Sequence, residues 1–338
     1  MPQTRCLRLL VVGWCAVLSI VAPLPAHAYL KFGIEVGGVT KVLRWNGAVP
    51  VPYYVSHEAL PNVSAADFQA AISRAFNAWE VVPTATVSYR FAGFTSNRPG
   101  DDDGLSTLGF LNEPALDQVL ATTSYLIDEL TGELLESDVF FNSAYAWSAG
   151  VSPVANRWDV ESIAVHEIGH FNGLGHSAIG ETTVSPSGRR VTSVGSVMFP
   201  IAIGVGDITA RTLDADDIAG LSDLYPTSQF TATTGSISGR VLKNGRGVFG
   251  AHVVAFDVAT GAQVANFSLS TAGAFSITGL RPGPHLLRVE PLDDADLESF
   301  FGGNEPVDVQ FAPRFLSKII IVPRGGDSGT VTVAVTPR

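Results

Sequence analysis

The 338-residue sequence has few cysteines and few methionines, two of each. Both cysteines, Cys6 and Cys15, lie in the first 28 residues, and removal of that segment would leave a chain with none. Without cysteine the remaining chain cannot form a disulfide framework, and no thiol is present to mask a metal ion. The fold must therefore depend on its apolar core, which about 310 residues can supply in two domains.

Basic residues are also scarce, with 21 Lys and Arg against 32 Asp and Glu. Without Arg5 and Arg8, which lie in the first 28 residues, the net charge is near −13. A surface of this sign repels phosphate groups, so nucleic acid and anionic membrane surfaces are excluded as partners. We expect a soluble monomer whose partners are proteins or peptides.

The sequence has only one long hydrophobic run, and it lies at the N-terminus. Arg5 and Arg8 precede an apolar stretch over residues 9–21, and Ala26, His27 and Ala28 offer small residues near a cleavage point. This pattern predicts a signal peptide over residues 1–28. An uncleaved membrane anchor is the alternative, but the run is shorter than the roughly 20 residues that span a bilayer. We therefore expect a secreted, extracellular protein, or a periplasmic one in a Gram-negative bacterium, without stable membrane insertion after cleavage.

Residues 166–176 read HEIGHFNGLGH, which matches the pattern HExxHxxGxxH. Four residues apart on a helix, His166 and His170 leave the same face and can bind one metal ion. A straight helix would carry His176 away, so the chain must turn, and Gly173 tolerates the positive φ of such a turn. The alternative is a solvated helix with two surface histidines, which leaves the fixed places of Gly173 and His176 unexplained.

Three neutral histidines leave a fourth tetrahedral position for water, which is the ligand count of a catalytic zinc site. Zinc lowers the pKa of such a water, and a carboxylate placed like Glu167 can accept its proton. The motif therefore predicts one zinc ion on His166, His170 and His176, with Glu167 as the general base.

The extended motif resembles that of the metzincin metallopeptidases. Met198, in the segment SVMFP over residues 196–200, stands where these enzymes have their Met-turn. Ser177 follows the third histidine, as in the matrixin family, and Pro200 occupies the place of a tyrosine found in astacin-like and serralysin-like members. The resemblance is therefore to matrixins, and it implies that Met198 lies beneath the metal.

The same resemblance implies several further features. Residues 120–123 would form the sheet edge to which an extended substrate adds, and residues 200–206 would wall an apolar pocket after the scissile bond. Asp216 and Asp217 would anchor the Met-turn. Phe140 stands where animal matrixins have a histidine for a second, structural zinc, so we expect one zinc ion only.

Calcium is a further ion that matrixins often bind. Asp101, Asp102 and Asp103 lie in a turn-rich loop over residues 97–104 and could supply oxygen ligands. A solvated acidic loop is the equal alternative, because the spacing matches no defined calcium loop.

The hydrophobic pattern predicts an α+β domain over residues 29–228. By resemblance this is a metzincin-type domain, with a twisted, mostly parallel sheet, an antiparallel edge strand and three helices. A helix opens at Ser64 and carries an apolar stripe on one face, which should pack into the core. The active-site helix covers residues 158–171 with Asn156 or Asp159 as its cap, and a closing helix covers residues 213–226. The segment over residues 175–195, rich in Ser, Thr and Gly, is expected to be a loop.

A polar linker is expected over residues 229–235, followed by an all-β sandwich over residues 236–338. Its short strands are separated by turn residues, a pattern typical of an antiparallel sandwich. The pattern resembles transthyretin-like, carboxypeptidase-regulatory-like modules. Its histidines, His252 and His285, have no clustered partners in the sequence. Strands are predicted over residues 236–242, 251–257, 265–269, 274–277, 285–290, 318–322 and 330–336.

Two functions remain open from the sequence. The first is a secreted zinc endopeptidase, and the second is an inactive, zinc-stabilised scaffold or adhesion protein that binds through its sandwich. Glu167 favours the first, because a structural metal site has no use for it. The enzyme would be exported active, or a carboxylate such as Glu35 would occupy the zinc until activation.

Overall fold

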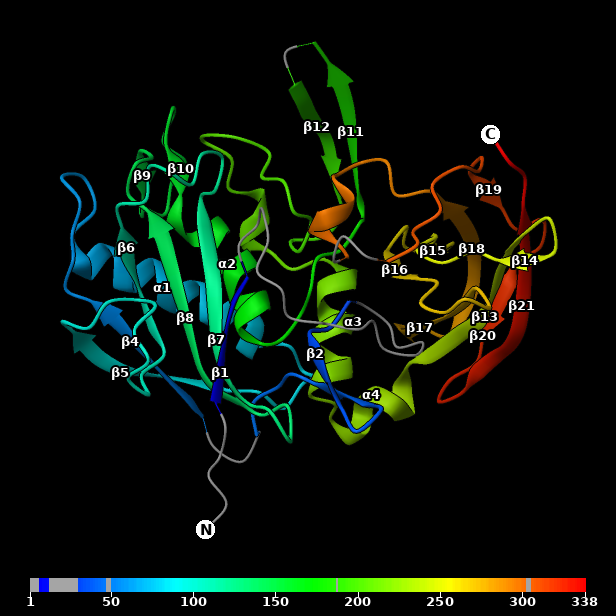
Figure 1. The fold of residues 1–338 in the computed structure, drawn as a ribbon, viewed down its shortest axis with the longest axis horizontal. Coiled ribbons are helices and arrows are strands. Elements are labelled where there is room, and N and C mark those ends of the chain that lie inside the picture. The colour runs from blue at the N-terminus through cyan, green and yellow to red at the C-terminus, as the bar shows by residue number, and fades with distance from the viewer. Residues whose placement is uncertain (1–5, 12–29, 47–49, 187, 302–304) are drawn as a thin grey trace.

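The computed structural model describes residues 6–11, 30–46, 50–186, 188–301 and 305–338 (Figure 1). Most of the predicted signal peptide, including its expected cleavage point, lies outside the described residues. Its residues Cys6–Val11 form strand β1. Among the described residues no helix is both long and apolar enough to cross a membrane.

The first half of the chain is built on a twisted sheet with the strand order β1-β7-β8-β6-β4-β5. Strands β4, β5, β6 and β8 run parallel to one another, whereas β7 is antiparallel to β8, and β1 is antiparallel to β7. The predicted mostly parallel sheet with an antiparallel edge is thus confirmed. Besides β1, the strands are β4 (Val51–Ser56), β5 (Tyr89–Thr95), β6 (Thr107–Leu111), β7 (Ala121–Asp128) and β8 (Leu134–Asn142).

Two helices, α1 (Ala65–Glu80) and α2 (Val160–Phe171), pack against each other and against this sheet (Figure 1). Ser64 caps α1 as predicted, since its side chain accepts the N–H of Asp67. The stripe of apolar residues expected on α1 is buried and meets α2, so α2 lies deep in the core. The stripe comprises Phe68, Ile72, Ala75, Phe76 and Trp79.

Short elements connect this framework. The segment after the third histidine of the motif, expected to be a loop, instead forms a ribbon of β11 (Gly180–Ser185) and β12 (Gly188–Val194) that projects from the body (Figure 1). The other short elements are β2 (Gly33–Val36), β3 (Val39–Val42), β9 (Trp147–Ser148), β10 (Trp158–Asp159) and the 3-10 turn η1 (Thr209–Arg211).

The second half is the predicted β-sandwich. One sheet has the order β14-β13-β17 with β21 on β13, and the other has the order β16-β15-β18-β19 with β20 on β18. An apolar core fills the space between them. The strands are β13 (Gly235–Lys243), β14 (Arg246–Gly247), β15 (His252–Asp257), β16 (Gln263–Phe267), β17 (Ala274–Leu280), β18 (Gly283–Glu290), β19 (Arg314–Phe315), β20 (Ile320–Val322) and β21 (Asp327–Val335), with η2 (Leu297–Ser299) a 3-10 turn.

The sandwich departs from the expected antiparallel pattern at one pair, because β13 and β21 run parallel. His252, for which the sequence offered no partner, lies with its Nδ1 3.1 Å from a carboxylate oxygen of Glu290 on the neighbouring strand. These contacts link distant parts of the sequence, which short-range patterns cannot reveal.

Helix α3 (Ala215–Leu224) lies between the two halves (Figure 1). Leu221 and Leu224 belong to the core of the first half, whereas Ala219 belongs to the core of the sandwich. The expected linker contains a short helix, α4 (Ser228–Thr233), with Phe230 buried. The two halves therefore share a packed interface.

Candidate metal centre

Helix α2 carries the first two histidines of the motif. Asp159 is its N-cap and accepts the N–H of Ser162, so of the two predicted caps it is Asp159 that acts. Trp79 of α1 donates its indole N–H to the carbonyl of Val165 over 2.8 Å. The turn that precedes His166 is thereby tied to the neighbouring helix.

The chain leaves α2 through Gly173, as the motif predicts. Gly173 has φ +96°, and its N–H donates to the carbonyl of His170. A Cβ here would lie 2.2 Å from the carbonyl oxygen of Leu43. The turn also pairs with residues just after the predicted signal peptide, where Phe32 donates its N–H to Gly173 and Gly175 donates to Leu30. Glycine is thus required by conformation and by space.

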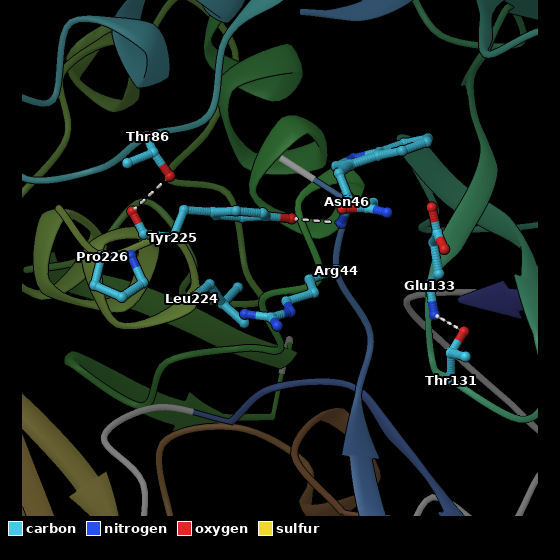
Figure 2. A pocket seen from close by; sticks show the side chains of 9 residues that line it. Arg44, Asn46, Thr86, Thr131, Glu133, Leu224, Tyr225 and Pro226 are labelled. Atoms are coloured by element: carbon cyan, nitrogen blue, oxygen red, sulfur yellow. Dashed lines mark hydrogen bonds between the residues drawn. The ribbon is translucent and has the colours of Figure 1, made fainter. Parts of the chain in front are cut away.

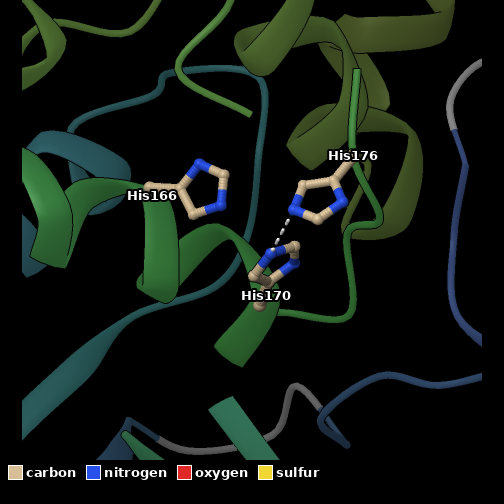
Figure 3. Close-up of side chains that lie close together, drawn as sticks. All are labelled: His166, His170 and His176. Atoms are coloured by element: carbon tan, nitrogen blue, oxygen red, sulfur yellow. Dashed lines mark hydrogen bonds between the residues drawn. The ribbon is translucent and has the colours of Figure 1, made fainter. Parts of the chain in front are cut away.

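The three imidazoles converge on one point (Figure 3). One ring nitrogen of each of His166, His170 and His176 lies within 4.8 Å of the others, and Nε2 of His170 is 3.1 Å from Nε2 of His176. Within the part of the chain that the structure describes, this is the one such cluster of His, Cys, Asp and Glu. Three imidazole nitrogens facing a common centre match the protein ligands of a catalytic zinc site.

Each imidazole is oriented by a backbone carbonyl on its far side. Nδ1 lies 2.7 Å from Val197 O in His166, 2.8 Å from Leu174 O in His170 and 2.6 Å from Ser299 O in His176. A carbonyl only accepts, so Nδ1 carries the proton and Nε2 offers its lone pair to the centre.

The protonation states agree with this arrangement. Burial lowers the pKa of His166, and burial together with the other two histidines lowers the pKa of His170 well below its usual value. Burial and His166 lower the pKa of His176 to about 3. Neutral imidazoles at neutral pH are the form that binds a metal.

Glu167 lies one residue from the first ligand and is 5% exposed. The hydroxyl of Thr123 on β7 donates to its Oε2 over 2.6 Å. Burial raises the pKa of this carboxyl to about 7, and the Thr123 bond opposes that shift. A divalent cation on the adjacent histidines would favour the ionised form further. Sequence spacing could not predict this contact, because Thr123 lies 44 residues earlier.

Met198 packs against the helix that carries the first two ligands. Its sulfur lies so close to α2 that a Cβ on Gly169 would be 2.1 Å from it. Asp217 holds the segment before Met198, because its carboxylate accepts from the Ser196 hydroxyl and from the N–H groups of Val197 and Met198. The carbonyl of Val197 then reaches His166, so this turn orients a ligand.

Gly169→Ala is expected to destabilise the protein by about 1–3 kcal/mol, because the methyl group must displace the Met198 sulfur. At an open helix position the same change would stabilise by about 1 kcal/mol. Urea unfolding of the metal-free protein measures the difference. In a Met198→Ala background the closest obstacle is removed and only the Trp79 ring remains, 3.0 Å from the added Cβ, so the cost should shrink. An equal cost in both backgrounds would contradict this packing.

Asp216 makes contacts that differ from those of Asp217. Its Oδ2 accepts the hydroxyl of Ser177 over 2.5 Å, and its Oδ1 accepts the N–H of Ala265 on β16 over 2.8 Å. It joins the segment after His176 to the sandwich. Because Ser177 donates its N–H to the carbonyl of Met198, Asp216 also reaches the Met-turn region through Ser177.

The far end of α2 is held by tyrosines. Tyr125 donates to the carbonyl of His170 and Tyr225 to that of Asn172, which pairs carbonyls that a helix end leaves unpaired. Tyr225 also lines a pocket of about 460 Å³, where its hydroxyl accepts from the N–H of Trp45 and its carbonyl from Thr86 (Figure 2). None of the three histidines lines this pocket, so it is not part of the metal centre.

The other predicted site residues do not join the cluster. Phe140 lies in β8, and Glu35 accepts from Thr40 in the β2–β3 hairpin. In the loop over residues 97–104, Glu136 accepts the N–H of Gly104 and Asp138 that of Gly100. Calcium on Asp101, Asp102 and Asp103 stays a prediction, as does a single zinc ion.

Comparison with known proteins agrees with this centre. The family model described as Matrixin matches residues 44–226. Metalloendoproteinase 5-MMP of Arabidopsis thaliana is 36% identical over 163 residues, 45% of this chain and 38% of that protein. Metalloendoproteinase 4-MMP of the same plant is 29% identical over 202 residues, 55% of this chain and 48% of that protein. Interstitial collagenase of Equus caballus is 24% identical over 181 residues, 50% of this chain and 30% of that protein.

The chain spans about half or less of the length of these relatives. Among solved structures, the major pilin subunit BcpA of Bacillus cereus shares 15% identity over 31% of each chain with a TM-score of 0.21, which is too low to relate the folds. The matrixin match covers more than half of the chain and contains the turn at Gly173, the three converging histidines and the Met-turn. The chain therefore belongs to the matrixin family, and His166, His170 and His176 are its zinc-binding triad.

Proposed function

We propose that this protein is a zinc-dependent endopeptidase with Glu167 as its general base. The observation that carries the proposal is the placement of Glu167, a buried carboxylate one residue from the first of three converging imidazoles and fixed by Thr123. Membership of the matrixin family supports it, as do the names of the plant relatives. A site that only held the fold together would not require a buried carboxylate beside the ligands.

Bound zinc supplies the positive charge that polarises a peptide carbonyl and acidifies a water molecule. Glu167 accepts the proton of the attacking water and returns it to the leaving amine. The hydroxyl of Thr123 fixes the orientation of the Glu167 carboxylate, and the three backbone carbonyls keep each imidazole in the tautomer that faces the metal. The buried surroundings of Glu167 raise its proton affinity, which suits a group that accepts and then returns a proton.

An extended peptide substrate would lie along the outer edge of β7. That edge pairs with β1 in an antiparallel register from Val11 opposite Thr123 to Cys6 opposite Asp128, so its backbone groups can take up a further strand. Loss of β1 with the signal peptide would free this edge. A substrate backbone over residues 120–123 would then pass beside Thr123 and Glu167. We propose protein or peptide substrates on this basis. Secretion and a monomeric state are proposed from the sequence alone, from the predicted signal peptide and the acidic composition.

The test uses the chain from residue 29 onward with a peptide library. We expect cleavage that stops when a chelator removes zinc and returns when zinc is added back. Mass spectrometry of the products gives the cleavage points, and metal analysis gives the number of zinc ions. A zinc-loaded, folded protein that cleaves no peptide would overturn the proposal and favour the inactive scaffold.

A further inference from the structure

The third zinc ligand is oriented by the second half of the chain. The carbonyl partners of His166 and His170, Val197 and Leu174, lie in the matrixin domain, whereas His176 donates to Ser299, 123 residues further on. The bond from Nδ1 of His176 to Ser299 O measures 2.6 Å, and His176 is buried. We propose that the β-sandwich completes the zinc centre, with Ser299 as a positioning residue for His176. This inference rests on the same histidine triad as the proposed peptidase.

The Ser299 carbonyl is held rigidly by its own surroundings. Ser299 is the last residue of the turn η2 and donates its N–H to the carbonyl of Asp296. Phe300 and Phe301 both donate their N–H groups to the carbonyl of Leu297. The rings of Phe300 and Phe301 pack on Phe267 at centroid distances of 5.7 and 5.4 Å. Since both rings are buried in the sandwich, the carbonyl is positioned before any metal binds.

The chain on the other side of this bond is fixed by the same packing. Ala178, two residues after His176, belongs to the apolar cluster that contains Phe267, Phe300 and Phe301. Ile179 packs with Val254 and Ala265 of the sandwich sheet. The segment that follows the third ligand is therefore embedded in the sandwich.

A buried carboxylate provides a second connection. Asp216 accepts the hydroxyl of Ser177, the residue after the third ligand, and the N–H of Ala265. Strand β16 is the edge of its sheet, so the N–H of Ala265 points away from its neighbour β15 and toward α3. Ser177 and the sandwich edge are thus held by one side chain.

These contacts have a defined consequence for the metal. A carbonyl on Nδ1 fixes the tautomer and the direction of Nε2, and loss of such a partner lowers metal affinity about 10- to 100-fold. Zinc retention by this matrixin should therefore depend on the docking of its sandwich, through His176 in particular.

Replacing a single backbone amide by an ester tests the bond in the full chain. Phenyllactic acid at position 300 turns the Ser299–Phe300 amide into an ester, whose carbonyl is a weaker acceptor, and removes the N–H that Phe300 donates to Leu297. The same replacement at position 301 removes the equivalent N–H to the same Leu297 carbonyl but leaves the Ser299 carbonyl as an amide. The two proteins differ in the acceptor that His176 meets.

The zinc dissociation constant is measured by competition with a chelator, without any peptide substrate. We expect the ester at position 300 to weaken zinc binding about tenfold and the ester at position 301 to change it less than about twofold. Equal changes in both proteins, or no change in either, would overturn the inference. Because hydrolysis is not measured, an inactive enzyme would still report on this bond.

A second pair of variants applies if the ester proteins do not fold. Ala265→Pro removes the N–H that Asp216 accepts, and Gln263→Pro places the same strain two residues away on the same edge strand. Zinc affinity should fall in Ala265→Pro and stay near the wild-type value in Gln263→Pro. Unchanged affinity in Ala265→Pro, with the fold intact by circular dichroism, would show that the sandwich does not support the metal centre.

Discussion

Glu167→Gln is expected to lower kcat for peptide hydrolysis by about 10²- to 10⁴-fold, the usual contribution of a general base, while zinc stays bound. Glutamine keeps the shape of the side chain and can still accept the Thr123 hydroxyl, but it cannot take a proton from water. The three histidines and their carbonyl partners are untouched, so the metal should remain at full stoichiometry. Steady-state rates with a fluorogenic peptide and metal analysis of the same samples measure both quantities.

Glu161→Gln is the matched control for Glu167. Glu161 is a second buried glutamate on α2, but it pairs with Arg74 and Arg211 rather than facing the histidines. Its replacement should lower the free energy of unfolding and leave kcat within a few-fold of the wild type. If Glu167→Gln keeps normal turnover with zinc in place, the proton acceptor has been assigned to the wrong residue.

Gly173→Ala is expected to destabilise the protein strongly and to weaken zinc binding. Two penalties apply, because the substituted residue would have to keep a positive φ of +96°, and its Cβ would lie 2.2 Å from the backbone oxygen of Leu43. A backbone oxygen, unlike a side chain, cannot move away by changing rotamer. The φ strain alone costs about 1–3 kcal/mol, and relief of the clash must move the turn that delivers His176. We therefore expect a loss of stability and a fall in zinc affinity of at least about tenfold.

Gly100→Ala separates the two penalties. Gly100 has φ +100°, close to that of Gly173, but no atom lies within 4 Å of the position where its Cβ would stand. It should lose about 1–3 kcal/mol of stability with zinc affinity unchanged. Isothermal titration of both apoproteins with zinc makes the comparison, and equal zinc affinity in the two variants would mean that the turn is not fixed by Leu43.

The sequence was sufficient for the features that depend on short spacing. The separation of four positions from His166 to His170 defines a helical face, and Gly173 before His176 marks the turn, so the triad could be predicted without any coordinates. The apolar stripe on α1 and the short, turn-separated strands of the sandwich were predictable for the same reason.

The partners of the ligands could not be predicted, because they come from distant segments. Thr123 reaches Glu167 across 44 residues and Ser299 reaches His176 across 123, and neither threonine nor serine carries a distinctive spacing. A backbone carbonyl also leaves no trace in the residue type. The different partners of Asp216 and Asp217 could not be predicted either, because Asp216 accepts an N–H from the sandwich whereas Asp217 accepts one from Val197.

The ribbon of β11 and β12 was missed for a different reason. Its residues are rich in Thr, Ser and Gly, which usually mark loops, and exposed side chains such as Val184 give it no buried face. The ribbon is instead held at its base, where Thr182 donates to Asp294 of the sandwich half through its N–H and hydroxyl. Tertiary contacts decide its structure where local preference does not.

The parallel pairing of β13 with β21 bears on the order in which the molecule folds. Ser236 and Ser238 at the start of the sandwich bond to Asp327, 91 and 89 residues later, so this sheet closes the largest loop of that half. Pairing across such a separation is slow compared with the formation of a hairpin such as β7–β8. Ser299 lies inside that loop, so newly made chains should hold their metal weakly until the last strand has been added.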